Sequence, residues 1–386
     1  MKTFAIDIRL IGKKRTGDET VFLELTRELL RQDRGNRYLL MTDETDEEKK
    51  KKVRERLGTP EHPSVEIVTL RAANRFAWNL FAVPRFLRGR PVDVYHTQYI
   101  LPFSVPRRTK VVMHVHDVSF AAYPHLIGFL DRLFLGLFIP RSLRRADLVV
   151  APSAFTKSEI TRYFGTAPEK IAVIPNAVGT GFLAESLRTI DPSALRQKYS
   201  LPEHFLLYVG TLQPRKNLPF LIRAFAGLKE RLPQVSLVLV GSREGHHFDP
   251  GIDKAIAEHG LEESVVFPGY VDQEDLPGLM RLAQAFVFPS LYEGFGIPLL
   301  EAMSQGVAVA ASDIPCLREV GGDAAVYFDP GNLATAQEKL YTLFTESSLR
   351  EPLISLGKER VRAYSWEKSA ALLVKEYQKL SSSEGS

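Results

Sequence analysis

Short apolar runs alternate with longer amphipathic stretches along nearly the whole of the 386-residue sequence. The runs are rich in β-branched and aromatic residues, whereas the stretches between them carry apolar residues at helical spacing, a pattern typical of repeated βαβ units. The sequence therefore predicts an α/β fold with two doubly wound, Rossmann-like domains. We expect strands at 4–10, 38–42, 65–70, 92–96, 110–117, 146–153 and 171–176 in the first half, and at 205–210, 235–241, 265–270, 285–290, 306–312 and 324–330 in the second.

The residues between these two series are rich in turn formers and contain no expected strand. A chain of 386 residues exceeds what one hydrophobic core usually supports, so two domains joined at this point are expected. We predict a first domain at 1–177, a linker at 178–203 and a second domain at 204–362. A final helix at 363–380 is expected to begin after Ser365, a good N-cap residue, and to precede a disordered tail.

The composition excludes several classes of protein. The chain has one cysteine, Cys316, which excludes an intrachain disulfide and argues against a cysteine-ligated zinc site. Its first residues enter an alternating apolar stretch and lack the features of a signal peptide. The best candidate for a membrane span, "LIGFLDRLFLGLFIP", is short and contains Asp131 and Arg132. We therefore expect a cytoplasmic protein that does not span a membrane.

Positive charge is concentrated in the first half of the chain, although the net charge is only +4. Residues 71–110 contain eight basic residues and one acid, Asp93, with large aromatic residues interleaved among them. This combination suits an anionic, partly apolar surface, so it favours peripheral contact with the inner face of a membrane. A solvated amphipathic helix whose aromatic residues lie in the core is an equal alternative. Nucleic acid is not expected as a partner, because no nucleic-acid-binding motif accompanies the basic residues.

The first cluster of candidate site residues follows the strand that is expected to end at Gly210. The loop after it contains Arg215 and Lys216, and Asn217 then precedes a stretch with helical periodicity and is expected to cap that helix. Two cations beside the free N–H groups and positive dipole end of a helix form a suitable site for a diphosphate. A solvated Arg-Lys pair is the alternative, and the position between a strand and a helix argues against it.

The second cluster, "LYEGFGIPLLEAMSQG", places Glu293 and Glu301 eight residues apart around a glycine-flanked turn. Pro298 is expected at the first position of a helix that covers about 299–305. Gly294 and Gly296 allow backbone N–H groups to approach a ligand closely. Because a carboxylate accepts two hydrogen bonds from a vicinal diol, one glutamate is suited to a ribose and the other to a sugar ring. A solvent-exposed Glu301 is the alternative, and its apolar neighbours argue against it.

The third cluster is "KVVMHVHDVSFAAYP", in which an apolar strand ends at His116 and Asp117. His114 lies inside the strand and is expected to be a packed core histidine, whereas His116 lies at the carboxyl end, where ligands of such sheets bind. The chain contains no Asp-x-Asp and no spacing typical of metal ligands, so no divalent cation is expected. It also contains no Gly-x-Gly-x-x-Gly and no Walker sequence, which argues against dinucleotide oxidoreductases and P-loop enzymes.

Four segments, "EGFGIPLLEA", "GTLQPRKN", "HDVSF" followed by "YP", and "YSWEKSA", together resemble the retaining glycosyltransferases of family 4, also called group 1 glycosyltransferases. The resemblance covers essentially all of residues 1–380. Its most specific element is the pair of glutamates separated by seven residues. The resemblance implies a GT-B fold, in which two Rossmann-like domains face each other across a cleft. It also implies an acceptor-binding first domain, a second domain that holds most of a nucleotide-sugar donor, and a final helix that returns to the first domain.

The resemblance implies a role for each matching residue. Arg215 and Lys216 would bind the donor diphosphate, Glu301 would bind the ribose hydroxyls, and His116 would border the reacting carbon. Glu293 and the amides of the following loop would hold the sugar ring. The implied donor-binding set is Gly17, Gly210, Arg215, Lys216, Glu293, Gly294, Phe295, Gly296, Ile297 and Glu301, and the implied catalytic set is His116, Glu293, Arg215 and Lys216.

One position departs from the pattern of the family. The first loop of the family commonly reads Gly-x-Gly before the first helix, whereas "KRTGDETVFLEL" has Gly17 and then Glu19. A carboxylate beside a diphosphate is unfavourable unless it points away or bonds the acceptor. The departure puts the role of Gly17 in doubt, and it leaves a changed substrate or a weakened activity open.

These clusters and the resemblance predict a retaining hexosyltransferase that needs no metal and no cofactor. The expected donor is a nucleotide sugar, with GDP-mannose favoured over UDP-glucose because "HDVSF" followed by "YP" resembles the mannosyltransferase subset of the family. The expected acceptor is a saccharide or a polyprenyl-linked glycan, in surface glycan biosynthesis. Retention is expected through attack from the face of the leaving group. The alternatives are a non-catalytic GT-B binding protein, suggested by Glu19, and a nucleotide-sugar epimerase.

Overall fold

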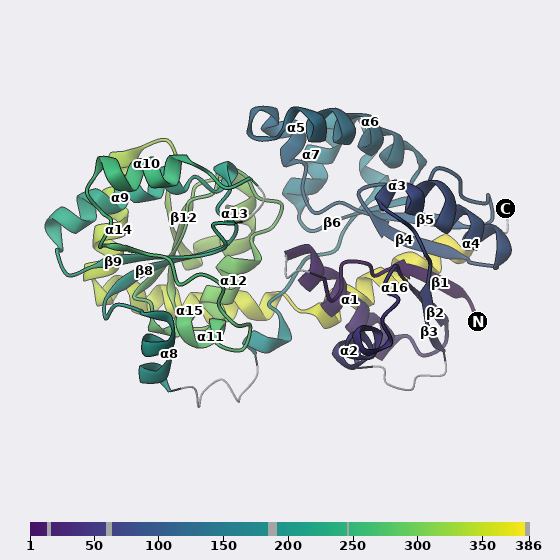
Figure 1. The fold of residues 1–386 in the computed structure, drawn as a ribbon, viewed down its shortest axis with the longest axis horizontal. Helices are drawn as coiled ribbons and strands as arrows, with labels where there is room; N and C mark the ends of the chain where they lie inside the picture. The colour runs from purple at the N-terminus through teal and green to yellow at the C-terminus, as the bar shows by residue number, and fades with distance from the viewer. Residues whose placement is uncertain (14–16, 59–63, 184–190, 245–246, 383–386) are drawn as a thin grey trace. The chain divides into compact units, whose positions relative to one another are not determined.

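Each half of the chain builds a fully parallel β-sheet with helices on both of its faces (Figure 1). The computed structural model describes residues 1–13, 17–58, 64–183, 191–244 and 247–382. These residues form two compact units. The first unit comprises residues 1–176 together with 365–386, and the second comprises residues 177–364. The prediction of two doubly wound domains is therefore confirmed.

The sheet of the first unit has the strand order β3-β2-β1-β4-β5-β6-β7. Its central strands are buried except at a terminal residue of β1, β4 and β5, which explains why they read as apolar runs rather than as alternating patterns. The strands are β1 (Thr3–Asp7), β2 (Arg37–Thr42), β3 (Val65–Thr69), β4 (Val94–Gln98), β5 (Lys110–His114), β6 (Leu148–Ala151) and β7 (Ile171–Val173).

The helices of the first unit connect these strands, apart from the last helix of the chain, which packs against α1. Their ends follow ordinary capping chemistry: the Ser153 hydroxyl accepts the Thr156 N–H at 3.0 Å, and Gly165 ends the same helix with φ of 63°. The helices are α1 (Gly17–Gln32), α2 (Glu47–Leu57), α3 (Arg75–Ala77), the π-helix η1 (Trp78–Ala82), α4 (Val83–Gly89), α5 (Ser119–Ala122), α6 (Phe129–Arg145), α7 (Ala154–Phe164) and α16 (Trp366–Ser382).

The sheet of the second unit has the strand order β10-β9-β8-β11-β12-β13. Its strands are β8 (Phe205–Val209), β9 (Ser236–Val240), β10 (Val265–Val266), β11 (Ala285–Phe288), β12 (Ala308–Ser312) and β13 (Ala325–Phe328). The helices around it are α8 (Pro192–Tyr199), the 3-10 helix η6 (Pro214–Lys216), α9 (Leu218–Arg231), α10 (Gly251–Glu258), α11 (Leu276–Leu282), α12 (Ile297–Ser304), α13 (Pro315–Gly321), α14 (Leu333–Thr345) and α15 (Ser347–Ala363).

All thirteen expected strands are present, with ends that differ by a few residues from the prediction. The described residues of the segment 178–203, which we expected to be a linker, belong to the second unit instead, and they include helix α8. The last helix begins at Trp366 after Ser365, whose hydroxyl accepts the Lys368 N–H at 3.2 Å, and it continues to Ser382. Residues 184–190 of the expected linker and 383–386 of the expected tail lie outside the described residues.

The strand order reverses once in each sheet. In the first sheet the reversal lies between β1 and β4, and in the second it lies between β8 and β11. Ligands of open parallel sheets bind beyond the carboxyl ends of the strands at such a reversal. The loops that follow β1, β4, β8 and β11 are therefore the places to examine for a site.

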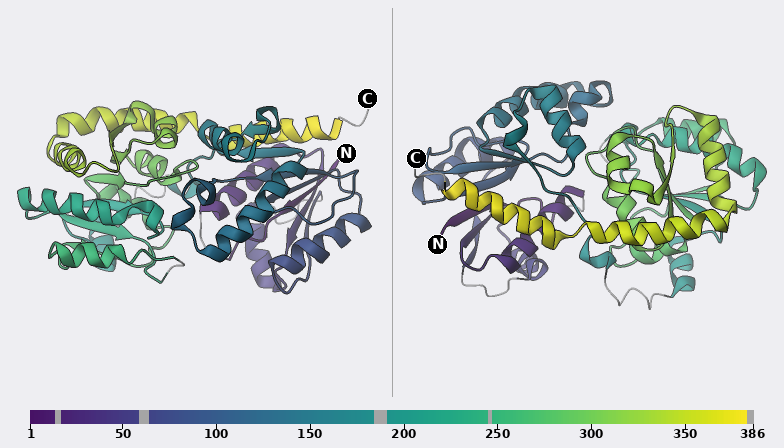
Figure 2. Two further views of the ribbon diagram at one scale, coloured as in Figure 1. Left: turned by 90° about the horizontal axis from the view of Figure 1, so that it is seen from above. Right: turned by 180° about the vertical axis from the view of Figure 1, so that it is seen from behind.

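Helix α16 completes the first unit although it is distant in sequence, and it lies beside α1 in both views of Figure 2. The Tyr377 hydroxyl lies 2.6 Å from Nδ1 of His96, at the start of a row of buried imidazole rings. The ring centroids of His96 and His114 are 5.8 Å apart, and those of His114 and His116 are 4.5 Å apart. Phe22 of α1 packs against all three rings. The expectation that His114 is a core histidine is confirmed, because its side chain has no exposed surface.

None of the helices in the described part of the chain is long and apolar enough to cross a membrane.

The buried histidine row predicts that the first unit loses stability in mild acid. Burial lowers the pKa of His96 from 6.5 to about 3, and burial also lowers the pKa of His114 well below 6.5. Between these values and pH 6.5 the unfolded chain binds protons that the folded unit does not bind, so stability falls as the pH is lowered. For His96 alone, the loss between pH 7 and pH 5 is about 2 kcal/mol, and His114 adds to it in the same direction.

Urea unfolding followed by tryptophan fluorescence measures this effect, because both tryptophans, Trp78 and Trp366, belong to the first unit. His114→Met retains a similar volume without a titrating ring, so it is expected to flatten the pH dependence between pH 7 and pH 5. His125→Gln, at an exposed position, is the control and should leave the dependence unchanged. An equal pH dependence in wild type and His114→Met would contradict this explanation.

Candidate functional site

The loops after β8 and β11 contain the first two clusters that the sequence indicates. Gly210 follows β8, and a side chain there would meet the Tyr208 hydroxyl, since a Cβ atom would lie 2.6 Å from it. The chain then forms η6, which carries Arg215 and Lys216, and enters α9 after Asn217. The strand order reverses at this point of the sheet, so the two cations occupy the position where a ligand is expected.

Asn217 does not cap α9 in the expected way. It occupies the N-cap position with φ of 57°, in the left-handed region, and its side chain accepts no hydrogen bond from the helix. Instead, its Nδ2 donates to the carbonyl of Pro330 at 3.2 Å, which fixes η6 to the loop after β13. Asparagine tolerates the left-handed conformation better than most residues, which accounts for its presence at this turn.

Glu293 joins the two loops through a shared carboxylate. Its Oε1 forms an ion pair with Nζ of Lys216, and its Oε2 lies 3.2 Å from Nη1 of Arg215. The same Nη1 donates to the Tyr292 carbonyl at 3.2 Å, and the Leu291 N–H donates to the Arg215 carbonyl at 2.9 Å. The sequence predicts phosphate contacts for the two cations and sugar contacts for the acid. The structure brings all three side chains into one group.

This group of charges is buried. Glu293 and Lys216 are each 7% exposed. Burial alone would raise the pKa of Glu293, but the charges of Lys216 and Arg215 outweigh it and lower that pKa from 4.5 to about 2. The Lys216 ammonium also lies 5.1 Å from the ring centroid of Phe288, the last residue of β11. The carboxylate is therefore ionised at neutral pH and holds both cations in fixed positions.

The loop between Glu293 and α12 requires glycine at position 296. Gly296 has φ of 99°, and a Cβ atom there would lie 2.8 Å from a methyl group of Leu317. Phe295 anchors the loop, because its ring is buried and meets Tyr364 edge-on at 5.4 Å. Helix α12 begins at Ile297, two residues before the predicted start, and Pro298 occupies its first turn.

Glu301 lies in α12 and is 7% exposed, so the alternative of a solvated helical acid is wrong. Its neighbours Leu299, Leu300, Ala302 and Met303 are buried as well, which makes α12 a helix surrounded by protein rather than by water. Such a position is costly for an acid unless polar groups compensate it. Both glutamates of the motif are therefore buried in the second unit.

His116 belongs to the first unit, two residues beyond the end of β5. It is 8% exposed, and its Nε2 lies 3.1 Å from Oε1 of Gln98, the last residue of β4. Its Nδ1 lies 3.7 Å from Oδ1 of Asp18, and the ring of Tyr99 packs against it at 5.6 Å. The sequence analysis missed Gln98 and Asp18. The position of Gln98 at the carboxyl end of a strand is the signal that could have identified it.

The structure explains the departure at Glu19. Its Oε1 accepts the backbone N–H of Gly12 at 2.9 Å and pairs with Nη1 of Arg56 at 2.8 Å, so it fastens the loop after β1 to α2. The carboxylate is 4% exposed and is occupied by these two donors. Gly17 is the first residue of α1, is exposed and has open space around its Cα, so no steric requirement for glycine exists there.

Among the residues that the structure describes, no group of three or more histidine, cysteine, aspartate or glutamate side chains is arranged to hold a metal ion.

Two family models match the sequence, one in each half. The model described as Glycosyltransferase Family 4 matches residues 15–182, and the model described as Glycosyl transferases group 1 matches residues 193–360. Among curated relatives, the O-antigen chain mannosyltransferase B of Escherichia coli is 32% identical over 321 residues, which are 82% of this chain and 80% of the relative.

Solved structures give the same result for the fold. Sucrose-phosphate synthase from Thermosynechococcus elongatus matches with a TM-score of 0.75 at 21% identity, over 100% of both chains. HepE from Anabaena, in complex with UDP and glucose, matches with a TM-score of 0.72 at 19% identity, over 98% of this chain and 100% of HepE. Since the family models cover most of both units and the Escherichia coli relative aligns with four fifths of the sequence, this chain belongs to the group 1 glycosyltransferases of family 4 and has the GT-B fold.

Proposed function

We propose that this glycosyltransferase moves mannose from GDP-mannose to a saccharide or polyprenyl-linked acceptor in surface glycan biosynthesis, with retention and without a metal ion. The observation that carries the proposal is the buried group of Arg215, Lys216 and Glu293 at the strand reversal of the second unit. The mannosyl donor is supported by the similarity to the O-antigen chain mannosyltransferase B of Escherichia coli, and a nucleotide-sugar donor by the UDP and glucose bound to HepE. Glu19 no longer supports a non-catalytic alternative, because Arg56 and Gly12 engage it.

The charges of the site suit the chemistry of a nucleotide sugar. The donor loses an anionic diphosphate while positive charge develops at the anomeric carbon, so cations fixed at the phosphates stabilise the transition state more than the ground state. Lys216 offers three N–H donors and Arg215 offers five, so each can bond Glu293 and phosphate oxygens together. In this proposal Glu293 holds hydroxyls of the sugar, Glu301 holds the ribose, and His116 borders the reacting carbon.

The same arrangement supports the proposal of retention and of independence from a metal ion. The carboxylate of Glu293 is bound by two cations, which lowers its nucleophilicity, so we favour attack by the acceptor from the face of the leaving group. The departing phosphate then takes the proton of the acceptor hydroxyl. The two cations supply the positive charge at the diphosphate that a divalent cation supplies in other transferases. Transfer should therefore persist in EDTA and give a product with the anomeric configuration of the donor.

The donor prediction can be checked by thermal shift. A ligand that binds only the folded protein raises its melting temperature, by the equivalent of about 2.7 kcal/mol at one hundred times the dissociation constant. GDP-mannose is expected to give the largest shift in a panel of GDP-, UDP- and ADP-sugars, and Lys216→Met should abolish it. A shift with UDP-glucose alone would contradict the choice of mannose, and no shift with any nucleotide sugar would contradict donor binding itself.

The ion-pair group also predicts a stability effect. Glu293→Gln leaves Lys216 buried without its counter-charge, so the second unit should lose about 3–5 kcal/mol, the usual effect of removing one partner of a buried ion pair. Hydrogen exchange of β11 in urea measures this for the second unit alone. The double variant Glu293→Gln with Lys216→Met should recover much of the loss. Glu359→Gln, an exposed helical position, is the control and should change stability by less than about 0.5 kcal/mol.

An acceptor in a membrane is supported by a surface of the first unit that we call the apolar-basic surface. It is built by α3, η1, α4, the loop around residue 103, and α6. The ring of Phe76 meets Phe134 of α6 at 5.4 Å, and the Arg75 guanidinium lies 4.4 Å from the Phe134 ring centroid. Its exposed apolar side chains are Phe76, Leu80, Phe81, Phe103, Leu133 and Leu137. Its arginines are Arg75, Arg85, Arg88, Arg141, Arg144 and Arg145.

The sequence indicated residues 71–110 for this surface, and α6 extends it. Phe81 is 69% exposed and Leu137 is 65% exposed, so the alternative in which the aromatic residues of this segment all lie in the core is wrong. Arginines flank exposed apolar residues, a combination that suits an anionic lipid surface. We propose that this surface docks the protein on the inner face of a membrane, as a cytoplasmic, peripheral protein.

Vesicle sedimentation tests the membrane proposal. The wild-type protein should sediment with vesicles that contain 30 mol% phosphatidylglycerol and should be released by high salt, whereas the variant Phe81→Ser with Leu137→Ser should remain in the supernatant. Leu356→Ser, an exposed apolar position in the second unit, is the matched control. Equal sedimentation of the double variant and the control would contradict the proposal.

A further inference from the structure

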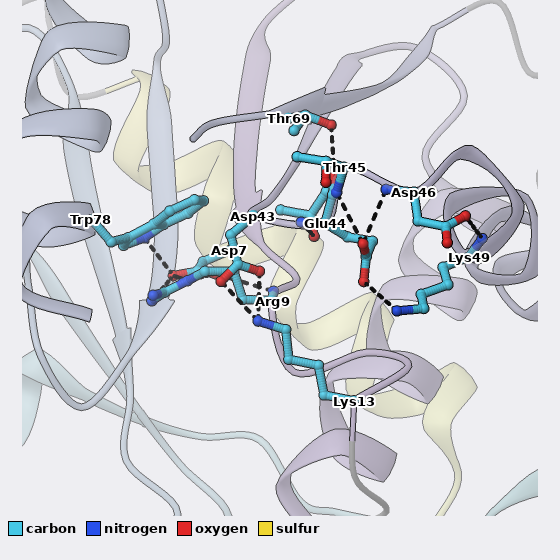
Figure 3. Close-up of polar contacts among 11 residues, drawn as sticks. Asp7, Arg9, Lys13, Asp43, Glu44, Thr45, Asp46, Lys49, Thr69 and Trp78 are labelled. Carbon is cyan, nitrogen blue, oxygen red and sulfur yellow. Dashed lines mark hydrogen bonds and ion pairs between the residues drawn. The ribbon is translucent and has the colours of Figure 1, made fainter. Parts of the chain in front are cut away.

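A buried polar cluster lies at the strand reversal of the first unit, at a place that the proposed donor site does not use. Asp7 ends β1, is 3% exposed, and accepts the Thr97 hydroxyl of β4 at 3.2 Å. It also accepts the indole N–H of Trp78 at 3.2 Å (Figure 3). Because β1 and β4 are the two strands between which the order reverses, this carboxylate occupies the position in the first sheet that corresponds to the cation loop in the second.

Asp7 holds the guanidinium of Arg9 in one fixed orientation. Nε of Arg9 lies 2.9 Å from Oδ1, and Nη2 lies 2.8 Å from Oδ2, in the paired geometry typical of arginine and a carboxylate. The guanidinium also lies 4.1 Å from the ring centroid of Trp78. Figure 3 shows the side chains of Asp7, Arg9 and Trp78 grouped together, with the indole N–H directed at the carboxylate. An arginine held on one edge and one face loses little further freedom when it binds a ligand.

The remaining edge of Arg9 is available. Within the described part of the chain, Nη1 of Arg9 donates to no acceptor, and the side chain is 22% exposed. A second cation, Lys13, follows on the same loop, and its ammonium pairs with Asp43 after β2 at 2.6 Å. The loop after β1 thus places two cations at the carboxyl edge of the sheet, the edge at which ligands bind.

Trp78 connects this cluster to the apolar-basic surface. It is the first residue of the five-residue π-helix η1, and Phe81, which is 69% exposed, is the fourth. The short helix η1 therefore packs its buried Trp78 against Arg9 and exposes its Phe81 to solvent. π-helical turns are rare and occur frequently at functional sites. A ligand that reaches Arg9 beside this surface can be anchored in a lipid layer.

We propose that Arg9 binds the phosphate or diphosphate of a lipid-linked acceptor, with Lys13 as a second cation, and so places the acceptor in the first unit. This inference rests on the proposed function, because it assigns part of the acceptor site of that transfer. The planar edge of a guanidinium bonds two phosphate oxygens at once, which a lysine cannot do. Asp7 acts as a positioning residue, since it orients Arg9 without facing the ligand.

The test measures binding of farnesyl diphosphate by calorimetry to the full chain at saturating GDP, which occupies the diphosphate position of the donor site. We expect Arg9→Gln to weaken binding at least tenfold. Arg9→Lys should weaken it by a smaller factor, because the charge remains and the planar edge is lost. Arg37→Gln is the control, because Arg37 belongs to the first unit, pairs with Glu66, and begins β2 at the opposite edge of the sheet. Unchanged binding in both Arg9 variants would overturn the proposal.

Two further measurements separate the possible outcomes. Inorganic pyrophosphate, titrated in the same way, should bind at least tenfold more weakly than farnesyl diphosphate, and equal binding would overturn the assignment to a lipid-linked ligand. Binding of GDP alone to the wild-type protein is measured first. If the wild-type protein does not bind GDP, that result contradicts the proposed function rather than this inference. The fluorescence of Trp78 and Trp366 reports whether each Arg9 variant retains the folded first unit, and Arg9→Lys keeps the test valid if Arg9→Gln does not fold.

Discussion

Parallel strands bring all of their carboxyl ends to one edge of a sheet, and this constraint determines where polar side chains gather in both units. In the first unit it collects Asp7, Gln98 and His116, which end or follow β1, β4 and β5. In the second it collects Lys216 and Glu293, which follow β8 and β11. The strands themselves are apolar and buried, so the chemistry of the protein is confined to the loops after them.

The ion pairs at the second reversal illustrate the conflict between stability and function. A buried ion pair often stabilises a fold less than a well-packed apolar core of the same size, because moving charges out of water is costly. Glu293, Lys216 and Arg215 offset this cost by pairing with one another across two loops. A site with fixed charges needs little reorganisation when charge develops in a ligand, which is the property that catalysis of this kind requires.

The sequence was sufficient to predict the strands and to place the candidate residues Arg215, Lys216 and Glu293 in the loops after them, because hydrophobic period and position after a strand are local signals. The sequence was insufficient to predict contacts between residues that are far apart in the chain. The Arg56 partner of Glu19 lies in another helix, and the Pro330 partner of Asn217 lies in the loop after another strand. For this reason the sequence could not show which groups engage Glu19, and the interpretation of Asn217 as a side-chain cap of the helix failed. Arg9 was overlooked because its orientation depends on Trp78, which is 69 positions away in the chain.

The packing of α16 has a consequence for the order in which the protein can form during synthesis. The first unit needs Tyr377 beside His96 and Phe4, and these contacts come from a helix that follows the whole second unit in the sequence. The second unit is continuous in sequence and can fold as soon as residue 364 has emerged. The first unit can therefore be completed only after the whole second unit has been synthesised, although most of its residues precede that unit in the sequence.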